Sequence, residues 1–201
     1  LKPKKNDIDI DVGANTGYYS LRLSSLVGDN GKIIAIEPDP QTFNALTKNC
    51  ELNNISNVNA HNIAISNSNG EITFHQSIFH SGTSSMFVNE KDKSEMKKLI
   101  IKTTTLDELV KEKYKQIAWI KIDVEGAELE VLKGSSTILS KTKNIIIEVH
   151  EHILNQNNKN SKEILEILEE NGFKITLLND FWDEKNSPNQ ILKSDYILGQ
   201  K

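Results

Sequence analysis

The chain has 201 residues, of which 37% are hydrophobic and 26% are charged, and its formal net charge is -4. This composition excludes the fibrous, collagenous and disordered classes, and the length suits one α/β domain, which we expect to span residues 1–201. Only Arg22 among the 24 basic residues is an arginine, so we expect no nucleic-acid partner, because nucleic-acid readers usually carry arginine-rich basic patches.

The single cysteine, Cys50, excludes an intrachain disulfide framework and suits a reducing compartment, so we expect a cytoplasmic protein. No apolar run approaches the ~18 residues that span a bilayer, which predicts no integral membrane segment. The basic N-terminus, residues 1–5, lacks the apolar stretch of a signal peptide. The sequence leaves open the oligomeric state and whether the chain is trimmed from a longer protein.

Predicted strands and helices alternate along the first third of the chain. Residues 7–12 alternate apolar and polar side chains, and residues 32–37 form a short apolar run, as buried strands do. Prolines at positions 38 and 40 end the second of these strands. The predicted elements are strands at 7–12, 32–37 and 58–65 and helices at 18–26 and 42–53.

The middle of the chain departs from this alternation. Two predicted strands, 71–77 and 99–104, enclose a Gly/Ser-rich loop and a charged stretch, and we expect a β-rich insertion at about residues 71–105. Alternation then resumes. Its elements are a short helix at 106–113, strands at 118–123 and 144–149, and helices beginning at 128 and 161.

The last two predicted strands, 173–178 and 196–198, have no helix between them, so we expect an antiparallel pair. The continuous apolar run at residues 144–149 is typical of a parallel strand that is covered on both faces. The sequence thus predicts an α/β fold with a mostly parallel sheet, an antiparallel last strand and a β-rich insertion.

The turn after the first strand contains Gly13 and Gly17 and occupies a nucleotide-binding position of α/β sheets. A dinucleotide site needs G-x-G-x-x-G, but Asn15 and Tyr18 stand at the second and third glycine positions. The carboxylate of Asp11 would repel a pyrophosphate and would suit an ammonium group. S-adenosylmethionine (SAM) carries an ammonium and a sulfonium and no phosphate, so the turn predicts SAM. A plain tight turn is the alternative.

Two further segments fit the same cofactor. Glu37, followed by Pro38, ends the second predicted strand, 20 residues after Gly17, where a carboxylate can accept both ribose hydroxyls. Asn62-Ile63-Ala64-Ile65 ends the third predicted strand, where an adenine ring would lie. We expect Ala64 or Ile65 to supply an apolar face and Asn62 a polar edge.

These motifs and several others resemble the FkbM-type SAM-dependent methyltransferases. The resemblance covers residues 7–172, and its most specific block is IKIDVEGAELEVLKG at residues 120–134. The other matching motifs are IDVGANTGYYS (10–20), IEPDP (36–40), SGTSSM (81–86), LDEL (106–109) and IIIEVH (145–150). The resemblance implies the class I, Rossmann-like fold, a three-layer sandwich with seven strands. It also implies SAM as cofactor and O-methylation of a hydroxyl, often on a sugar or natural product.

The candidate catalytic residues are Asp123, Glu125 and His150, which follow strands at the ligand-binding edge. A hydroxyl acceptor must lose its proton, and His150 has the most suitable ordinary pKa for a general base. Asp123 could instead act as base, orient the acceptor or bind the cofactor, and Glu125 could cap a helix. Glu148 is expected to make a structural hydrogen bond. We expect no metal.

Other candidates and functions stay open at this stage. His80 could line the acceptor site and Phe181-Trp182 could stack on a sugar. The leading function is methyl transfer to a hydroxyl of a small molecule or glycan. The alternatives are an amine, carboxylate or nucleic-acid acceptor, a nucleotide-dependent oxidoreductase and a non-catalytic SAM-fold binding module. The Asn/Asp-Pro-Pro-aromatic tetrad of many nucleic-acid N-methyltransferases is absent after the fourth strand of the main alternation, and the missing glycines oppose the oxidoreductase.

Overall fold

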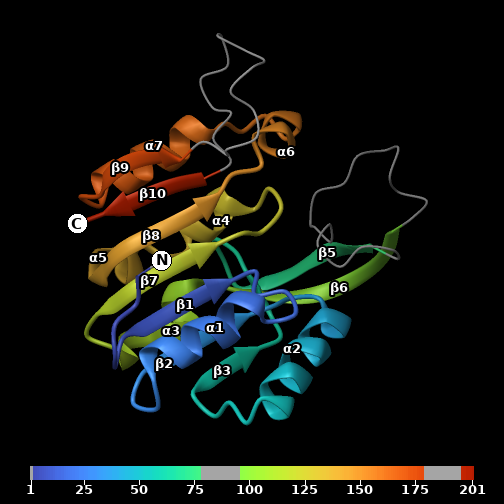
Figure 1. Ribbon diagram of the computed structural model, residues 1–201. Helices are drawn as coiled ribbons and strands as arrows, with labels where there is room; N and C mark the ends of the chain where they lie inside the picture. The colour runs from blue at the N-terminus through green and yellow to red at the C-terminus, as the bar shows by residue number, and fades with distance from the viewer. Residues whose placement is uncertain (1, 78–95, 179–195) are drawn as a thin grey trace, which may run out of the picture.

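A computed structural model describes residues 2–77, 96–178 and 196–201, and a seven-stranded sheet forms its centre (Figure 1). Neighbouring strands are parallel except β10, which is antiparallel to β8 and to β9. The predicted antiparallel last strand is therefore confirmed. In spatial order the strands are β3 (Val58–His61), β2 (Lys32–Ile36), β1 (Ile8–Val12), β7 (Ile117–Ile122), β8 (Thr142–Glu148), β10 (Tyr196–Gln200) and β9 (Lys174–Leu178).

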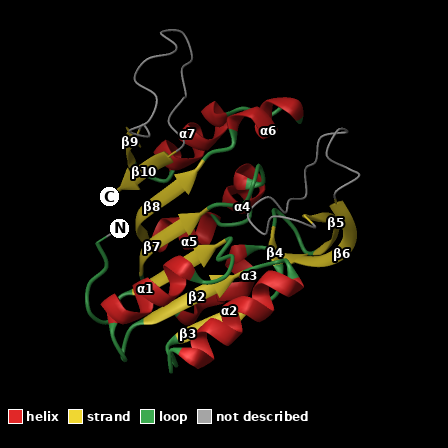
Figure 2. Cartoon of the chain, turned by 45° about the vertical axis from the view of Figure 1, so that its right-hand side comes forward, coloured by secondary structure: helices red, strands yellow, loops and turns green. Residues whose placement is uncertain are grey.

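Helices cover both faces of this sheet and complete three layers (Figure 2). Alternate residues of β2 separate the two faces, because Ile33 and Ala35 pack against α1 and α2, whereas Ile34 and Ile36 belong to the main core. The helices are α1 (Tyr18–Val27), α2 (Pro40–Leu52), α3 (Leu106–Val110), α4 (Glu128–Lys133), α5 (Ser136–Lys141), α6 (Glu151–Gln156) and α7 (Ser161–Glu170), with a 3₁₀ turn, η3 (Lys111–Lys113).

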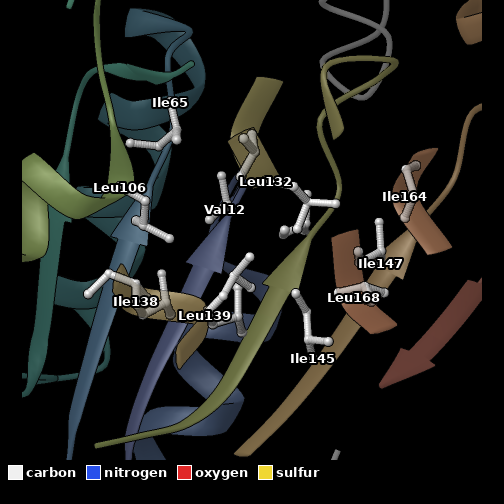
Figure 3. Packing of buried hydrophobic residues seen from close by; sticks show 14 of the residues in the cluster. Val12, Ile65, Leu106, Leu132, Ile138, Leu139, Ile145, Ile147, Ile164 and Leu168 are labelled. Carbon is white, nitrogen blue, oxygen red and sulfur yellow. The ribbon is translucent and has the colours of Figure 1, made fainter. Parts of the chain in front are cut away.

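The main core lies between the sheet and helices α3, α4, α5 and α7. Ile145 and Ile147 of β8 face Leu132 of α4, and Ile164 and Leu168 of α7 (Figure 3). All five side chains are buried to 1% exposure or less. Burying one such side chain stabilises the fold by roughly 1.5–3 kcal/mol, so this core holds the carboxyl end of β8 in a fixed position.

The insertion forms a second, three-stranded sheet beside the first. Its order is β4 (Ala64–Ile65), β6 (Met96–Thr104) and β5 (Gly70–Ser77). The predicted strand 58–65 is wrong in one respect, since it divides after His61 and its last two residues join this second sheet. Asn62 lies at the division, where its side-chain amide donates to the carbonyl oxygens of Glu37 and Pro38 at 2.8 and 3.0 Å.

Other elements also differ from the prediction. Helix α2 begins at Pro40 rather than at residue 42, because the Asp39 carboxylate accepts hydrogen bonds from the Gln41 and Thr42 amides. Helices α5 and α6 are short and were not predicted. In the described part of the chain, no helix combines the length and apolar character that crossing a bilayer requires.

Candidate functional site

A cleft opens where β1, β2 and β7 end. One wall, which we name the turn wall, consists of Gly13, Asn15 and Glu37. The apolar end of the cleft is formed by Ile63, Ala64, Ile65, Ile72 and Phe74. The acidic end consists of Asp123, Glu125 and Glu148. Ligands of open α/β sheets bind at this strand edge, so the cleft is the candidate site.

Gly13 adopts a left-handed conformation with φ of 77° at the bottom of the turn wall. Its amide donates to the Ile36 carbonyl at 3.0 Å, which joins the turn to β2. A Cβ atom at this position would lie 1.8 Å from the carbonyl oxygen of Asp123. The backbone of Asp123 therefore occupies the space that a side chain at position 13 would need, and only glycine fits there.

Glu37 is buried at 7% exposure and ties the turn wall together. One carboxylate oxygen accepts from the Asn15 amide at 2.9 Å, and the other accepts from the Asp39 amide at 2.8 Å. Burial raises the pKa of Glu37 to about 7, although these two amides lower it. Glu37 and Pro38 both line the cleft, at the position that the sequence assigns to a ribose-binding carboxylate.

The apolar end contains two of the three residues predicted around an adenine ring. Ala64 and Ile65 line it, whereas Asn62 does not, because its amide nitrogen binds the backbone of Glu37 and Pro38. Ile72 and Phe74 of β5 also line this end and were not predicted. Ile72 and Phe74 are two positions apart, so the sequence places them on one face of a strand. Only the folded insertion shows that this face covers the apolar end of the cleft.

Asp11 and Gly17, which the sequence assigns to cofactor binding, are not among the residues that line the cleft. The Asp11 side chain is fully buried, and its carboxylate accepts from the Ser20 hydroxyl at 2.6 Å and lies 3.5 Å from the Lys121 ammonium nitrogen. Burial raises its pKa, against the opposing effect of Lys121. Gly17 precedes α1, where a Cβ would lie 2.7 Å from Leu21. In this structure both residues contact neighbouring parts of the protein.

Asp123 and Glu148 come from neighbouring strand ends, β7 and β8, and meet at the acidic end. The Asp123 carboxylate lies 3.2 Å from the ammonium of Lys121. Tyr196 donates a hydrogen bond to Glu148, as expected of a structural partner, and burial raises the pKa of Glu148. Lys121 was not predicted as a site residue. The signal available was a lysine within the otherwise apolar strand AWIKI.

His150 lies between two carboxylates rather than in the cleft wall. Its Nδ1 is 2.8 Å from Glu128 and its Nε2 is 3.3 Å from Glu125. Burial alone lowers the pKa of His150, but the Glu128 hydrogen bond and the charge of Glu125 raise it to about 9. The imidazole is thus protonated near neutral pH. The sequence assigns the general base to His150, and the structure places both of its ring nitrogens against carboxylates.

Glu125 has the properties that the base requires. It lines the cleft, and burial raises its pKa to about 7, although the charge of His150 lowers it. A base with a pKa near the working pH combines sufficient ionisation with sufficient basicity. Glu125 also adopts a positive φ of 51°, a conformation that is uncommon outside glycine and recurs at functional sites.

Asp123, Glu148 and His150 can each place one ligand atom within 4.8 Å of the others. Each of these groups already has a partner of opposite charge or a hydrogen-bond donor, namely Lys121, Tyr196 and the two glutamates beside His150. No metal is therefore assigned to this cluster. The candidates His80 and Phe181-Trp182, and the SGTSSM motif, lie outside the described residues.

Comparison of the chain with known proteins identifies a matching family and several relatives. The family described as Methyltransferase FkbM domain matches residues 11–175. The hexuronic acid methyltransferase AglP of Haloferax volcanii is 33% identical over 149 residues, which cover 73% of this chain and 57% of AglP. The 2-O-methyltransferase NoeI of Sinorhizobium fredii is 26% identical over 181 residues, which cover 84% of this chain and 73% of NoeI.

Among solved structures, the methyltransferase FkbM of Methylobacillus flagellatus matches with a TM-score of 0.64 at 17% identity. The match covers 100% of this chain and 45% of that one. The predicted class I fold is confirmed by this likeness. The chain spans 57% of the length of AglP, so it corresponds to about half of that relative.

Proposed function

Because the chain belongs to the FkbM family of SAM-dependent methyltransferases, we propose that it transfers a methyl group from SAM to a hydroxyl of a sugar, glycan or related metabolite. The observation that carries the proposal is one cleft that joins the turn wall to the acidic end. The names of AglP and NoeI, a hexuronic acid methyltransferase and a 2-O-methyltransferase, support this class of acceptor.

The turn wall and the apolar end fit SAM. Glu37 offers a buried carboxylate for the ribose hydroxyls, and Ala64, Ile65 and Phe74 offer apolar surface for the adenine. The Asn15 amide contacts Glu37 and Gly13 packs against the backbone of Asp123, so these two residues connect Glu37 to the acidic end, where the methionine part would bind. When bound, SAM supplies a methyl group on a sulfonium, which is an excellent leaving group.

At the acidic end, Glu125 acts as the general base and removes the proton of the acceptor hydroxyl. Asp123 orients the acceptor, because its carboxylate lies in the cleft and is held in place by Lys121. His150 holds Glu125 through the contact between Nε2 and its carboxylate. Alignment of the reacting atoms provides much of the remaining rate. The three carboxylates of the acidic end also favour an acceptor that presents hydroxyl groups, because they would repel an anionic acceptor.

Two experiments test the proposal in sequence. Calorimetry with SAM, S-adenosylhomocysteine and NAD first identifies the cofactor, and we expect binding of the first two only. A transfer assay with methyl-labelled SAM over a panel of sugars and glycolipids then identifies the acceptor. Binding of NAD alone contradicts the cofactor assignment. Transfer to amines or carboxylates, with none to hydroxyls, contradicts the proposed acceptor class.

A further inference from the structure

Lys121 occupies an unusual place for a lysine, in the central strand β7 and at 8% exposure. Its neighbours Ile120 and Ile122 are buried in the main core on the opposite face of the sheet. An ammonium in such a place is costly unless opposite charges and hydrogen-bond acceptors surround it. The groups around Lys121 therefore explain why it is there.

Four groups surround the Lys121 ammonium nitrogen. It lies 3.5 Å from Asp11, 3.2 Å from Asp123 and 3.4 Å from the carbonyl oxygen of Gly13. The ring of Tyr19 covers it, with 5.2 Å between the nitrogen and the ring centroid. The ion pair with the buried Asp11 would by itself offset the cost of burying the Lys121 ammonium. The other two polar contacts instead reach the two sides of the cleft.

We propose that Lys121 is a positioning residue for methyl transfer, which holds the Asp123 carboxylate against the glycine turn. This inference rests on the proposed function. The backbones of these segments already meet, because the Asp123 amide donates to the Val12 carbonyl at 3.0 Å. That bond fixes the chain but leaves the carboxylate of Asp123 free to rotate. The ammonium of Lys121 supplies the constraint on the side chain.

The position of Lys121 behind the cleft supports this role. Asp123 lines the cleft, whereas Lys121 does not line it. Lys121 therefore acts through Asp123 and not by contact with a ligand. Removing it is expected to change the turnover of bound substrates and to leave the affinity for SAM nearly intact.

The test must separate positioning from a contribution to the core. Lys121→Met leaves the buried Asp11 carboxylate without its ion-pair partner, which destabilises the fold whatever the role of Lys121. The double variant Asp11→Asn/Lys121→Met removes both charges together. We expect it to fold with a melting temperature near that of Asp11→Asn, to bind SAM within about threefold of Asp11→Asn, and to have a kcat at least tenfold below that of Asp11→Asn with little change in acceptor KM.

The single variant Asp11→Asn is the reference for the double variant, because it removes the same buried carboxylate but keeps Lys121. Lys133→Met is the control for losing a lysine, since Lys133 pairs with Glu163 on the surface. A double variant that regains the kcat of Asp11→Asn overturns the inference, and so does one that unfolds, because Lys121 then serves the core alone. Failure of wild-type protein to methylate any hydroxyl contradicts the proposed function instead.

Discussion

The turn wall and the acidic end of the cleft are built in different ways. In the turn wall, backbone amides of Asn15 and Asp39 hold Glu37, and Gly13 fits against backbone. In the acidic end, side chains hold side chains, as Lys121 does for Asp123 and His150 for Glu125. Backbone contacts depend on the fold, whereas side-chain pairs depend on each partner and on pH.

This difference has a functional consequence. A wall made from backbone and one buried carboxylate suits a ligand that stays the same, such as a cofactor. An end made from charged pairs can be changed one residue at a time, which suits an acceptor-binding region. Substitutions in the turn wall should therefore affect binding, whereas substitutions in the acidic end should affect turnover and its pH dependence.

The largest effect is expected from Gly13→Val. The new side chain must displace the Asp123 carbonyl, which a Cβ would approach to 1.8 Å, and the positive φ adds strain. We expect no SAM binding detectable by calorimetry and a lower melting temperature. Gly172→Val is the matched control, because Gly172 also has a positive φ, of 80°, but no atom lies within 4 Å of its Cβ position. Equal binding by both variants contradicts the close-approach explanation.

Glu125→Gln should have the next largest effect. An amide cannot accept the acceptor proton, and loss of a general base costs roughly 10²–10⁴-fold in rate. Single-turnover kinetics with a saturating acceptor should show this loss in kcat, while the dissociation constant for SAM changes little. The surface variant Glu108→Gln, which loses only an exposed pair with Lys111, serves as the control. Full activity of Glu125→Gln would exclude Glu125 as the base.

Glu37→Ala should weaken SAM binding without altering the chemistry of the bound state. Loss of a charged acceptor costs roughly 1.5–3 kcal/mol, or about 10- to 100-fold in the dissociation constant. Calorimetry on the folded variant measures this change. Glu51→Ala, on the exposed side of α2, is the control. Unchanged SAM affinity in a folded Glu37→Ala variant contradicts the ribose assignment.

His150→Gln should change the pH dependence more than the maximal rate. The charge of His150 lowers the pKa of Glu125, which is about 7, so its removal should raise that pKa. The limb of the kcat profile that rises through about pH 7 should then move to higher pH, with a few-fold loss at pH 7. Were His150 the base, the limb would disappear and the activity would not recover at high pH.

The smallest effect is expected from metal chelation. Asp123, Glu148 and His150 are close enough to hold an ion, but each is already paired within the protein. Treatment with EDTA should leave kcat and the melting temperature unchanged. A loss of activity that Mg²⁺ or Mn²⁺ restores would show that these residues form a metal site.

The acidic end shows why the sequence alone predicts the positions of the site residues better than their pKa values. Asp123 and Glu125 were predicted because they follow a strand at the ligand edge, and both line the cleft. His150 was chosen for its ordinary pKa, but in the fold its neighbours raise that pKa to about 9. Those neighbours, Glu125 and Glu128, lie 25 and 22 positions earlier in the sequence, so only their spatial proximity reveals the effect.

The sequence by itself determined the α/β class, the glycine turn after the first strand and the position of Glu37 at the end of the second strand, because these follow from local periodicity and from backbone constraints. Tertiary structure alone decided that Asp11 faces Lys121 instead of the cleft, and that Ile72 and Phe74 line the apolar end. It also decided that the pKa of Glu125 is raised to about 7 and that of His150 to about 9. The physical reason is that burial and pairing depend on residues far apart in the chain, and pKa values depend on burial and pairing.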